Sequence, residues 1–232
     1  YSFPVGEKIT VLVGDKTDAS ALYSTACVYG GLTNTLDDCG VPNTAIEKPD
    51  DTGVALSASY DIGNGFTGAI GYAGNGTGNE GLGTEDGLDF YGGQLTYTGD
   101  SYGASVTYAN LDVATSWGLN GYYSFASDLP SVSVGYEFSE AEAGILAAAE
   151  VEATQWFVGL QWDELGNGTL GVALGSRGPQ LEDAEEDMAY ELFYTYNVND
   201  SMSITPAIFI LEDNDPGADD ETGVVVKTSF SF

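Results

Sequence analysis

Two cysteines are the residues of this sequence whose type and spacing most directly suggest chemistry. Cys27 and Cys39 lie 12 positions apart in a stretch rich in Gly, Thr, Asn and Asp. A pair of thiols in such a loop favours a disulfide, formed in an oxidising compartment, over a metal site. We therefore predict a Cys27–Cys39 disulfide.

Enzymatic chemistry has little support, because the sequence contains no histidine. Ser-His-Asp and Cys-His catalysis, the common His-containing zinc sites and a general base poised near neutral pH all require an imidazole. No Ser-Lys spacing offers a substitute. We predict that the protein is not an enzyme and has no catalytic residues, no metal site and no cofactor.

Acidic residues dominate the charge, with 36 Asp and Glu against 5 Lys and Arg and a formal net charge of −31. Such a surface repels phosphate backbones, so nucleic acid is excluded as a partner. The stretch Asp213 to Gly217 has only a loose similarity to a calcium loop, and a solvated acidic loop is the favoured interpretation. Acidic residues are concentrated in three predicted long loops, at 80–86, 182–187 and 213–221.

The elements that must position these residues are β-strands. Apolar residues alternate with polar ones, and the apolar face holds no Asp, Glu, Lys or Arg. The one stretch with helical periodicity, 141–153, is short. Pro206 falls within a predicted strand, where it predicts a bulge or a local break because proline has no N–H to donate. The twelve predicted segments are 9–13, 54–62, 66–72, 91–97, 102–108, 117–125, 132–138, 156–162, 170–174, 190–198, 202–210 and 224–232.

Three further patterns separate a membrane barrel from a secreted or halophilic all-β protein, which would also alternate. The face opposite the apolar one is small and polar, the connections alternate between short and long, and aromatic residues gather at both ends of the strands. These are the features of an outer-membrane barrel with periplasmic turns and outer loops. The fold class we predict is an all-β, antiparallel transmembrane β-barrel in a single domain, 1–232.

Three stretches of sequence resemble a known family. The terminal TGVVVKTSFSF, the opening YSFPVGEKITVLVG and the hairpin SASYDIGNGFTGAIGYAG are similar to the C-terminal barrel part of cyanobacterial outer-membrane porins, grouped with the OprB-like carbohydrate-selective and iron-uptake porins. The resemblance covers essentially the whole chain. It implies that Phe232 is the outer-membrane assembly signal.

The resemblance also implies a barrel of about 16 strands, of which this chain holds about 12. Tyr1 to Phe3 would then end a preceding strand, and Pro4 to Lys8 would form its turn. A closed 12-stranded barrel is the alternative. Family members carry a signal peptide and, upstream, a surface-layer-homology domain and a coiled coil that bind the cell wall. None of these is present in the sequence given, so we expect a mature or truncated chain.

The expected function is a water-filled channel in the outer membrane for passive diffusion of small hydrophilic solutes, carbohydrates among them, and inorganic ions. The expected partners are outer-membrane lipids, the solutes and ions, and further copies in a homotrimer. The alternative is a structural or adhesion barrel whose acidic loops bind divalent ions. We expect segment 15–52 to fold inward as a constriction, and the predicted pore-lining residues are Glu137, Asp163, Arg177, Glu191, Lys227, Asn120, Tyr122, Gln155 and Gln161.

Overall fold

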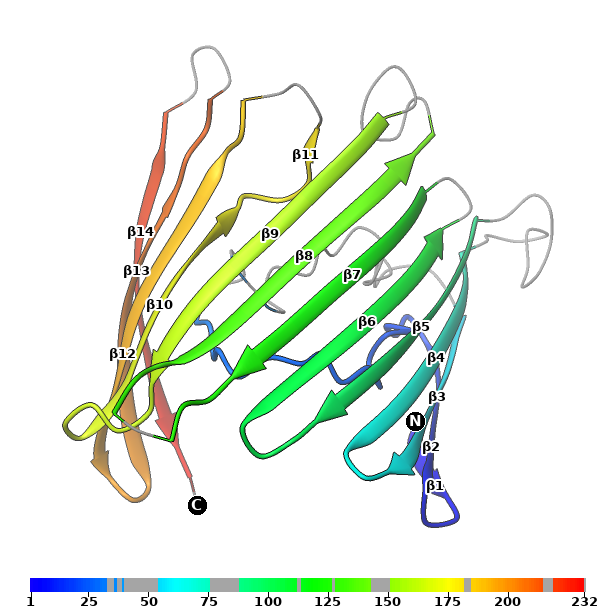
Figure 1. The fold of residues 1–232 in the computed structure, drawn as a ribbon, viewed down its shortest axis with the longest axis horizontal. Coiled ribbons are helices and arrows are strands. Elements are labelled where there is room, and N and C mark those ends of the chain that lie inside the picture. The colour runs from blue at the N-terminus through cyan, green and yellow to red at the C-terminus, as the bar shows by residue number, and fades with distance from the viewer. Residues whose placement is uncertain are drawn as a thin grey trace.

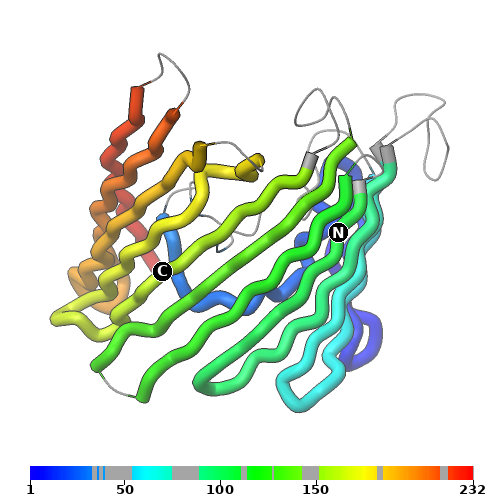
Figure 2. The backbone as a smooth tube through the Cα atoms, turned by 45° about the horizontal axis from the view of Figure 1, so that its top comes forward, coloured from blue at the N-terminus to red at the C-terminus, as the bar shows by residue number. Residues whose placement is uncertain are grey.

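The structure, a computed structural model, describes residues 1–32, 36, 39, 54–75, 88–111, 114–126, 128–142, 151–181, 185–214 and 219–231. These residues form one large antiparallel sheet that curves around a central space (Figures 1 and 2). None of the described residues forms a helix that is long and apolar enough to cross a membrane.

Consecutive strands are neighbours throughout the sheet, with one exception. The short β11 leaves the path and pairs with the upper end of β9, where Gln180 lies opposite Thr154. The strands are β1 (Ser2–Val5), β2 (Ile9–Asp15), β3 (Val54–Gly63), β4 (Phe66–Asn75), β5 (Leu88–Thr98), β6 (Tyr102–Leu111), β7 (Ala114–Tyr123), β8 (Ser131–Ala141), β9 (Val151–Trp162), β10 (Gly168–Ser176), β11 (Gln180–Leu181), β12 (Met188–Asn199), β13 (Met202–Leu211) and β14 (Glu221–Phe230).

The fold class is confirmed, and each of the twelve predicted segments corresponds to one strand of the sheet. Two of the segments were predicted too long, because β7 ends at Tyr123 rather than 125 and β14 ends at Phe230. The predicted end of a preceding strand is β1, which continues through Pro4 to Val5, so that the turn is shorter than predicted. Pro4 is tolerated because β1 is an edge strand and needs no donor on its free side. The short β11 has no alternating pattern and was not predicted.

Short turns lie at one rim and longer connections at the other, as the sequence predicts (Figure 1). The exception is the two-residue link between β6 and β7 at the long-loop rim. The short stretch with helical periodicity, 141–153, is strand at both of its ends, because Ala141 belongs to β8 and 151–153 belong to β9. Residues 143–150 lie outside the described part.

The expected disturbance at Pro206 appears as a gap in one ladder. The β12–β13 register continues from Phe193↔Ala207 to Tyr196↔Ile204 without the two pairs between them, while Pro206 remains paired with Val226 on β14. The threonine hydroxyls of Thr195 and Thr205 bridge the gap at 3.0 Å. The local break therefore removes backbone pairs between β13 and β12, whereas the pairing of β13 with β14 is continuous.

The two faces of the sheet have opposite characters. The outward face is apolar and exposed, as Ile70 at 67% and Leu119 at 50% illustrate, whereas polar residues such as Ser57 and Thr107 on the concave face are 1% exposed. In water this arrangement would leave a large apolar surface uncovered. In a bilayer the same surface is stabilised by contact with lipid.

Aromatic side chains pack against one another near both rims of the outward face. Phe66, Tyr97 and Tyr102 form a row at the short-turn rim with ring centroids 4.9 and 5.4 Å apart, and Tyr108 lies 4.9 Å from Trp117 toward the other rim. Amphipathic rings favour the interface between hydrocarbon and water. The two groups therefore mark the heights at which the bilayer begins and ends.

Neighbouring valines on β14 test the assignment of the faces. Val226 lies on the outward face and is 64% exposed, whereas Val225 lies opposite Ala207 on the concave face. We expect Val226→Arg to destabilise the folded protein in phospholipid vesicles by about 2–4 kcal/mol, the cost of a basic residue near the bilayer midplane. Val225→Arg, beside the exposed Lys227, should cost much less in the same urea-unfolding measurement. Equal costs would contradict the assignment.

Candidate functional site

The segment that follows β2 turns inward and crosses the concave face of the sheet. Figures 1 and 2 both show it in blue, passing through the central space behind the green strands. We call residues 17–32 the inward segment. Its start is held at β3, where the Ser57 hydroxyl donates to the Ala19 carbonyl.

Polar side chains of successive strands hold the inward segment through its backbone amides. The Ser24 N–H donates to Gln94 Oε1 on β5 at 2.5 Å, and the Ala26 N–H donates to Ser105 Oγ on β6 at 3.0 Å. The Ser133 hydroxyl on β8 accepts the N–H groups of both residues 28 and 29, at 3.1 and 3.2 Å. The concave face therefore supplies acceptors along the whole path of the segment.

The far end of the inward segment reaches β9 and β12. The Gly30 N–H donates to Gln161 Oε1 at 2.9 Å, and the Leu32 N–H donates to the Glu191 carboxylate at 3.2 Å. The Tyr29 hydroxyl donates to Glu191 Oε1 at 2.8 Å. Burial, and then the neighbouring Glu191 carboxylate, raise the pKa of Tyr29, so this hydroxyl keeps its proton and remains a donor.

Apolar contacts accompany these hydrogen bonds. The Tyr29 ring lies between Phe157 and Phe193, with ring centroids 5.4 and 5.6 Å away. At the other end Tyr23 packs on a buried cluster that contains Ala19 and Phe90. The two clusters give the segment buried anchors at both ends of its path.

Two glycines let backbone from the 16–53 connection approach the wall. A Cβ at Gly71 would overlap the Ala19 carbonyl, and a Cβ at Gly135 would overlap the Cys39 carbonyl. Both glycines lie on the concave face, so any side chain there would push the connection away from the sheet.

The predicted disulfide is present between Cys27 and Cys39, with Cα atoms 6.3 Å apart. It joins the middle of the inward segment to the residue whose carbonyl faces Gly135. The disulfide therefore lies inside the sheet, where it closes a loop that is already held by the wall.

The structure brings five of the predicted pore-lining residues to the covered part of the concave face. Gln161 and Glu191 hold the inward segment, as described above. Glu137, Asn120 and Gln155 are 0%, 5% and 8% exposed and lie on the adjacent strands β8, β7 and β9. Each of these five side chains is either buried or hydrogen-bonded to the inward segment.

The other predicted residues lie elsewhere. The Tyr122 hydroxyl donates to the Gly99 carbonyl at 2.9 Å, near the short-turn rim, where Asp163 Oδ1 accepts from Gln161 Nε2 at 2.6 Å. Lys227 lies on the concave face of β14 and is exposed. Phe232 lies outside the described residues.

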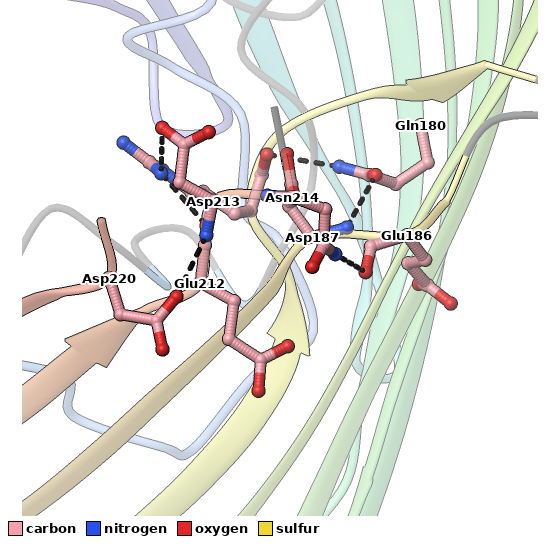
Figure 3. A network of polar contacts seen from close by, with 8 residues as sticks. Gln180, Glu186, Asp187, Glu212, Asp213, Asn214 and Asp220 are labelled. Atoms are coloured by element: carbon pink, nitrogen blue, oxygen red, sulfur yellow. Dashed lines mark hydrogen bonds and ion pairs between the residues drawn. The ribbon is translucent and has the colours of Figure 1, made fainter. Parts of the chain in front are cut away.

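Arg177 follows β10 at the long-loop rim and takes part in a polar network. Figure 3 labels Asp213, Asn214, Asp187 and Gln180 among the members of this network. Its guanidinium donates to the Glu212 carbonyl at 2.8 Å and pairs with Asp213 at 3.1 Å. The network continues as the Asn214 N–H donates to Asp187 Oδ1 at 2.8 Å, and the Asp187 N–H donates to Gln180 Oε1 at 2.9 Å. Arg177 thus links the connection that precedes β12 to the connection that follows β13.

Sequence reasoning missed the residues that hold the inward segment. Gln94, Ser105 and Ser133 alternate with the apolar residues of their strands, but nothing in their spacing shows that they accept hydrogen bonds from the inward segment. Tyr29 carried no recognisable signal. Within the described ranges, no three His, Cys, Asp or Glu side chains gather as a metal site.

Comparisons with known proteins agree with this geometry. Residues 6–208 match the family model described as Gram-negative porin. No curated protein sequence matches the chain. The fold is similar to that of the anion-selective porin from Comamonas acidovorans, with a TM-score of 0.59 and 18% identity over 77% of this chain. The chain spans 59% of the length of that porin.

A second solved structure, of a porin refined at 1.8 Å resolution, has a TM-score of 0.67 and 18% identity, and the match covers 96% of this chain and 77% of that one. These likenesses confirm the fold. The family model matches most of the chain and the exposed apolar face fits a bilayer, so this protein of the outer membrane belongs to the Gram-negative porin family.

Proposed function

We propose that the chain forms the wall and the constriction of a water-filled channel for passive diffusion of small hydrophilic solutes and inorganic ions. The observation that carries this proposal is the inward segment, tied by its backbone to β5, β6, β8, β9 and β12. Such a segment narrows the space that the sheet encloses but does not fill it. Diffusion through it requires no catalytic group, and we infer that the protein has no enzymatic activity.

We further propose that the channel prefers cations. Acidic residues surround the long-loop rim, including Glu186, Asp187 and Asp220. Two described basic residues lie toward the same rim: Arg177, which is already paired with Asp213, and the exposed Lys16, which follows β2. An opening lined by one sign of charge concentrates counter-ions. Lys227 on the wall opposes this preference. The proposed pore residues, which act directly or by holding the inward segment, also include Glu137, Asp163, Arg177, Glu191, Asn120, Tyr122, Gln155 and Gln161.

The finer assignments are also proposals. The motifs named above support an OprB-like subfamily, a cyanobacterial source and carbohydrates among the solutes. Family membership supports a homotrimer surrounded by outer-membrane lipids. The edges β1 and β14 are not paired with each other in the sheet order, and a sheet in hydrocarbon needs closed edges, which supports a barrel with further strands beyond those described.

The alternative, an acidic structural barrel that binds divalent ions at its loops, gives no role to the inward segment. Single-channel recording in planar bilayers separates the two. Open, ohmic channels are expected of the diffusion channel, and a non-conducting, correctly folded barrel would contradict it.

Ion selectivity tests the electrostatic part of the proposal. In a salt gradient near about 0.1 M, where the screening length is about 10 Å, the reversal potential should show a cation preference that weakens toward about 1 M. Lys227→Gln should strengthen the preference because it removes the exposed basic residue of the wall. Lys8→Gln is the matched control, since the Lys8 ammonium lies 5.9 Å from the Tyr60 ring at the short-turn rim. A clear anion preference in the unmodified protein would refute the argument.

Reduction of the disulfide tests whether the inward segment sets the pore width. In the chain-entropy model, opening a loop of this size releases roughly 3 kcal/mol of restraint, so the segment should become more variable in position. We expect a changed or noisier single-channel conductance after reduction, with complete reduction checked by thiol titration. The Cys27→Ala/Cys39→Ala variant should not respond to the reductant. An unchanged conductance in the fully reduced protein would show that the disulfide does not shape the pore.

A further inference from the structure

A hollow of about 560 Å³ lies on the outward face of the sheet, across strands β2 to β7. Its floor is formed where three outward positions carry small residues: Ala58 on β3, Gly68 on β4 and Gly93 on β5. Ligand sites in proteins typically have volumes of about 300–1,000 Å³. The hollow is therefore large enough to hold part of a small molecule.

The register shows that the hollow is a narrow trough. In one cross-strand row Gly68 stands between Tyr60 and Leu95. In the next row Gly93 stands beside Ile70, which is left 67% exposed. Neighbouring strands are about 4.8 Å apart, so each gap is as wide as the one missing side chain. A single hydrocarbon chain fits a trough of this width, whereas the broad convex wall of a second barrel would pass over it.

Other strands of the same face have no counterpart to these gaps in the equivalent rows. On β8, β9 and β10 the residues Val134, Val158 and Leu174 lie opposite one another, each with a branched aliphatic side chain. The trough is thus a local feature of the lipid-facing surface. In hydrocarbon it requires an occupant, because the lining of an empty space loses its dispersion contacts on one side.

A basic residue lies at the short-turn end of the trough. The Lys8 ammonium is 5.9 Å from the centroid of the Tyr60 ring, and Tyr60 lines the trough. Lys8 is one of five Lys and Arg residues in the sequence, and within the described ranges it forms no ion pair. Of the acids beside it in the turns, Asp61 accepts the Gly63 N–H at 2.8 Å and Glu7 is exposed. This end of the trough therefore offers an ammonium group to an anion.

We propose that the trough binds one glycerophospholipid of the periplasmic leaflet, with an acyl chain over Gly68 and Gly93 and the headgroup phosphate at Lys8. The apolar floor and walls match the chain, and the ammonium matches the phosphate, which lysine binds as a point charge. The proposal rests on the outer-membrane location and on the short turns being periplasmic, and it does not depend on the channel function. It gives the small residues of β3, β4 and β5 a common role.

The test is native mass spectrometry of the assembled protein in detergent, titrated with phosphatidylglycerol. The wild type should bind one phosphatidylglycerol per protomer more tightly than any further ones. Lys8→Gln should weaken this first binding about fivefold, the contribution of one basic residue near an anionic lipid surface. Lys16→Gln is the matched control: it removes an exposed lysine that follows β2 toward the other rim, and it should bind like the wild type.

Filling the trough tests the position of the acyl chain. Gly68→Leu should weaken the first binding at least about tenfold, since even one methylene in an apolar pocket is worth about 10–200-fold. The protein has room for this side chain, because a Cβ at Gly68 would meet only Ile62, at an ordinary 3.6 Å. Gly121→Leu, which adds the same side chain on the outward face of β7 but outside the trough, should bind like the wild type. Ala58→Leu fills the trough from β3 and replaces Gly68→Leu if that variant fails to assemble.

Three results would overturn the proposal. The site is absent if the wild type binds no phosphatidylglycerol in preference to further ones, or if the trough-filling variants bind it as tightly as the wild type. Unchanged binding in Lys8→Gln would refute the position of the headgroup. An altered oligomeric state with unchanged lipid binding in Gly68→Leu would show that a second copy of the chain covers the trough instead.

Discussion

The constraint on which the whole structure depends is that backbone polar groups in hydrocarbon must be paired. A sheet meets it by pairing each strand with both neighbours, and side chains then alternate between lipid and the enclosed space. The exposed apolar face, the aromatic rims and the small polar concave face are consequences of that alternation. Even the single proline in a central strand, Pro206, shows its effect as two missing pairs in one ladder.

The strands could be predicted from the sequence because period-two alternation is a local property. Each residue reports its own face, so positions such as Leu119 and Thr107 are assigned without knowledge of the rest of the chain. The same is true of the disulfide, since Cys27 and Cys39 are the only two cysteines. The short β11 escaped because two residues are too few to show a period.

The functional geometry could not be predicted to the same extent, because it depends on the path of the connection after β2. Gln161 and Glu191 alternate with the apolar residues of their strands, but whether they meet water or backbone depends on where residues 30 and 32 lie. The burial of Glu137 is similarly non-local. Arg177 follows the alternation of β10, yet its charge is taken up by Asp213 from a connection more than thirty positions away in the chain.

The hydrogen bonds that hold the inward segment have a direction. The segment donates from its backbone at residues 24, 26, 28, 29, 30 and 32, and the wall accepts with side chains. Backbone amides are the same whatever side chain a residue carries, proline excepted. Substitutions away from the side-chain anchors Tyr23, Cys27 and Tyr29 therefore leave these backbone hydrogen bonds intact while they alter the surface of the segment. The passage can diversify, through evolution or by design, on an unchanged barrel.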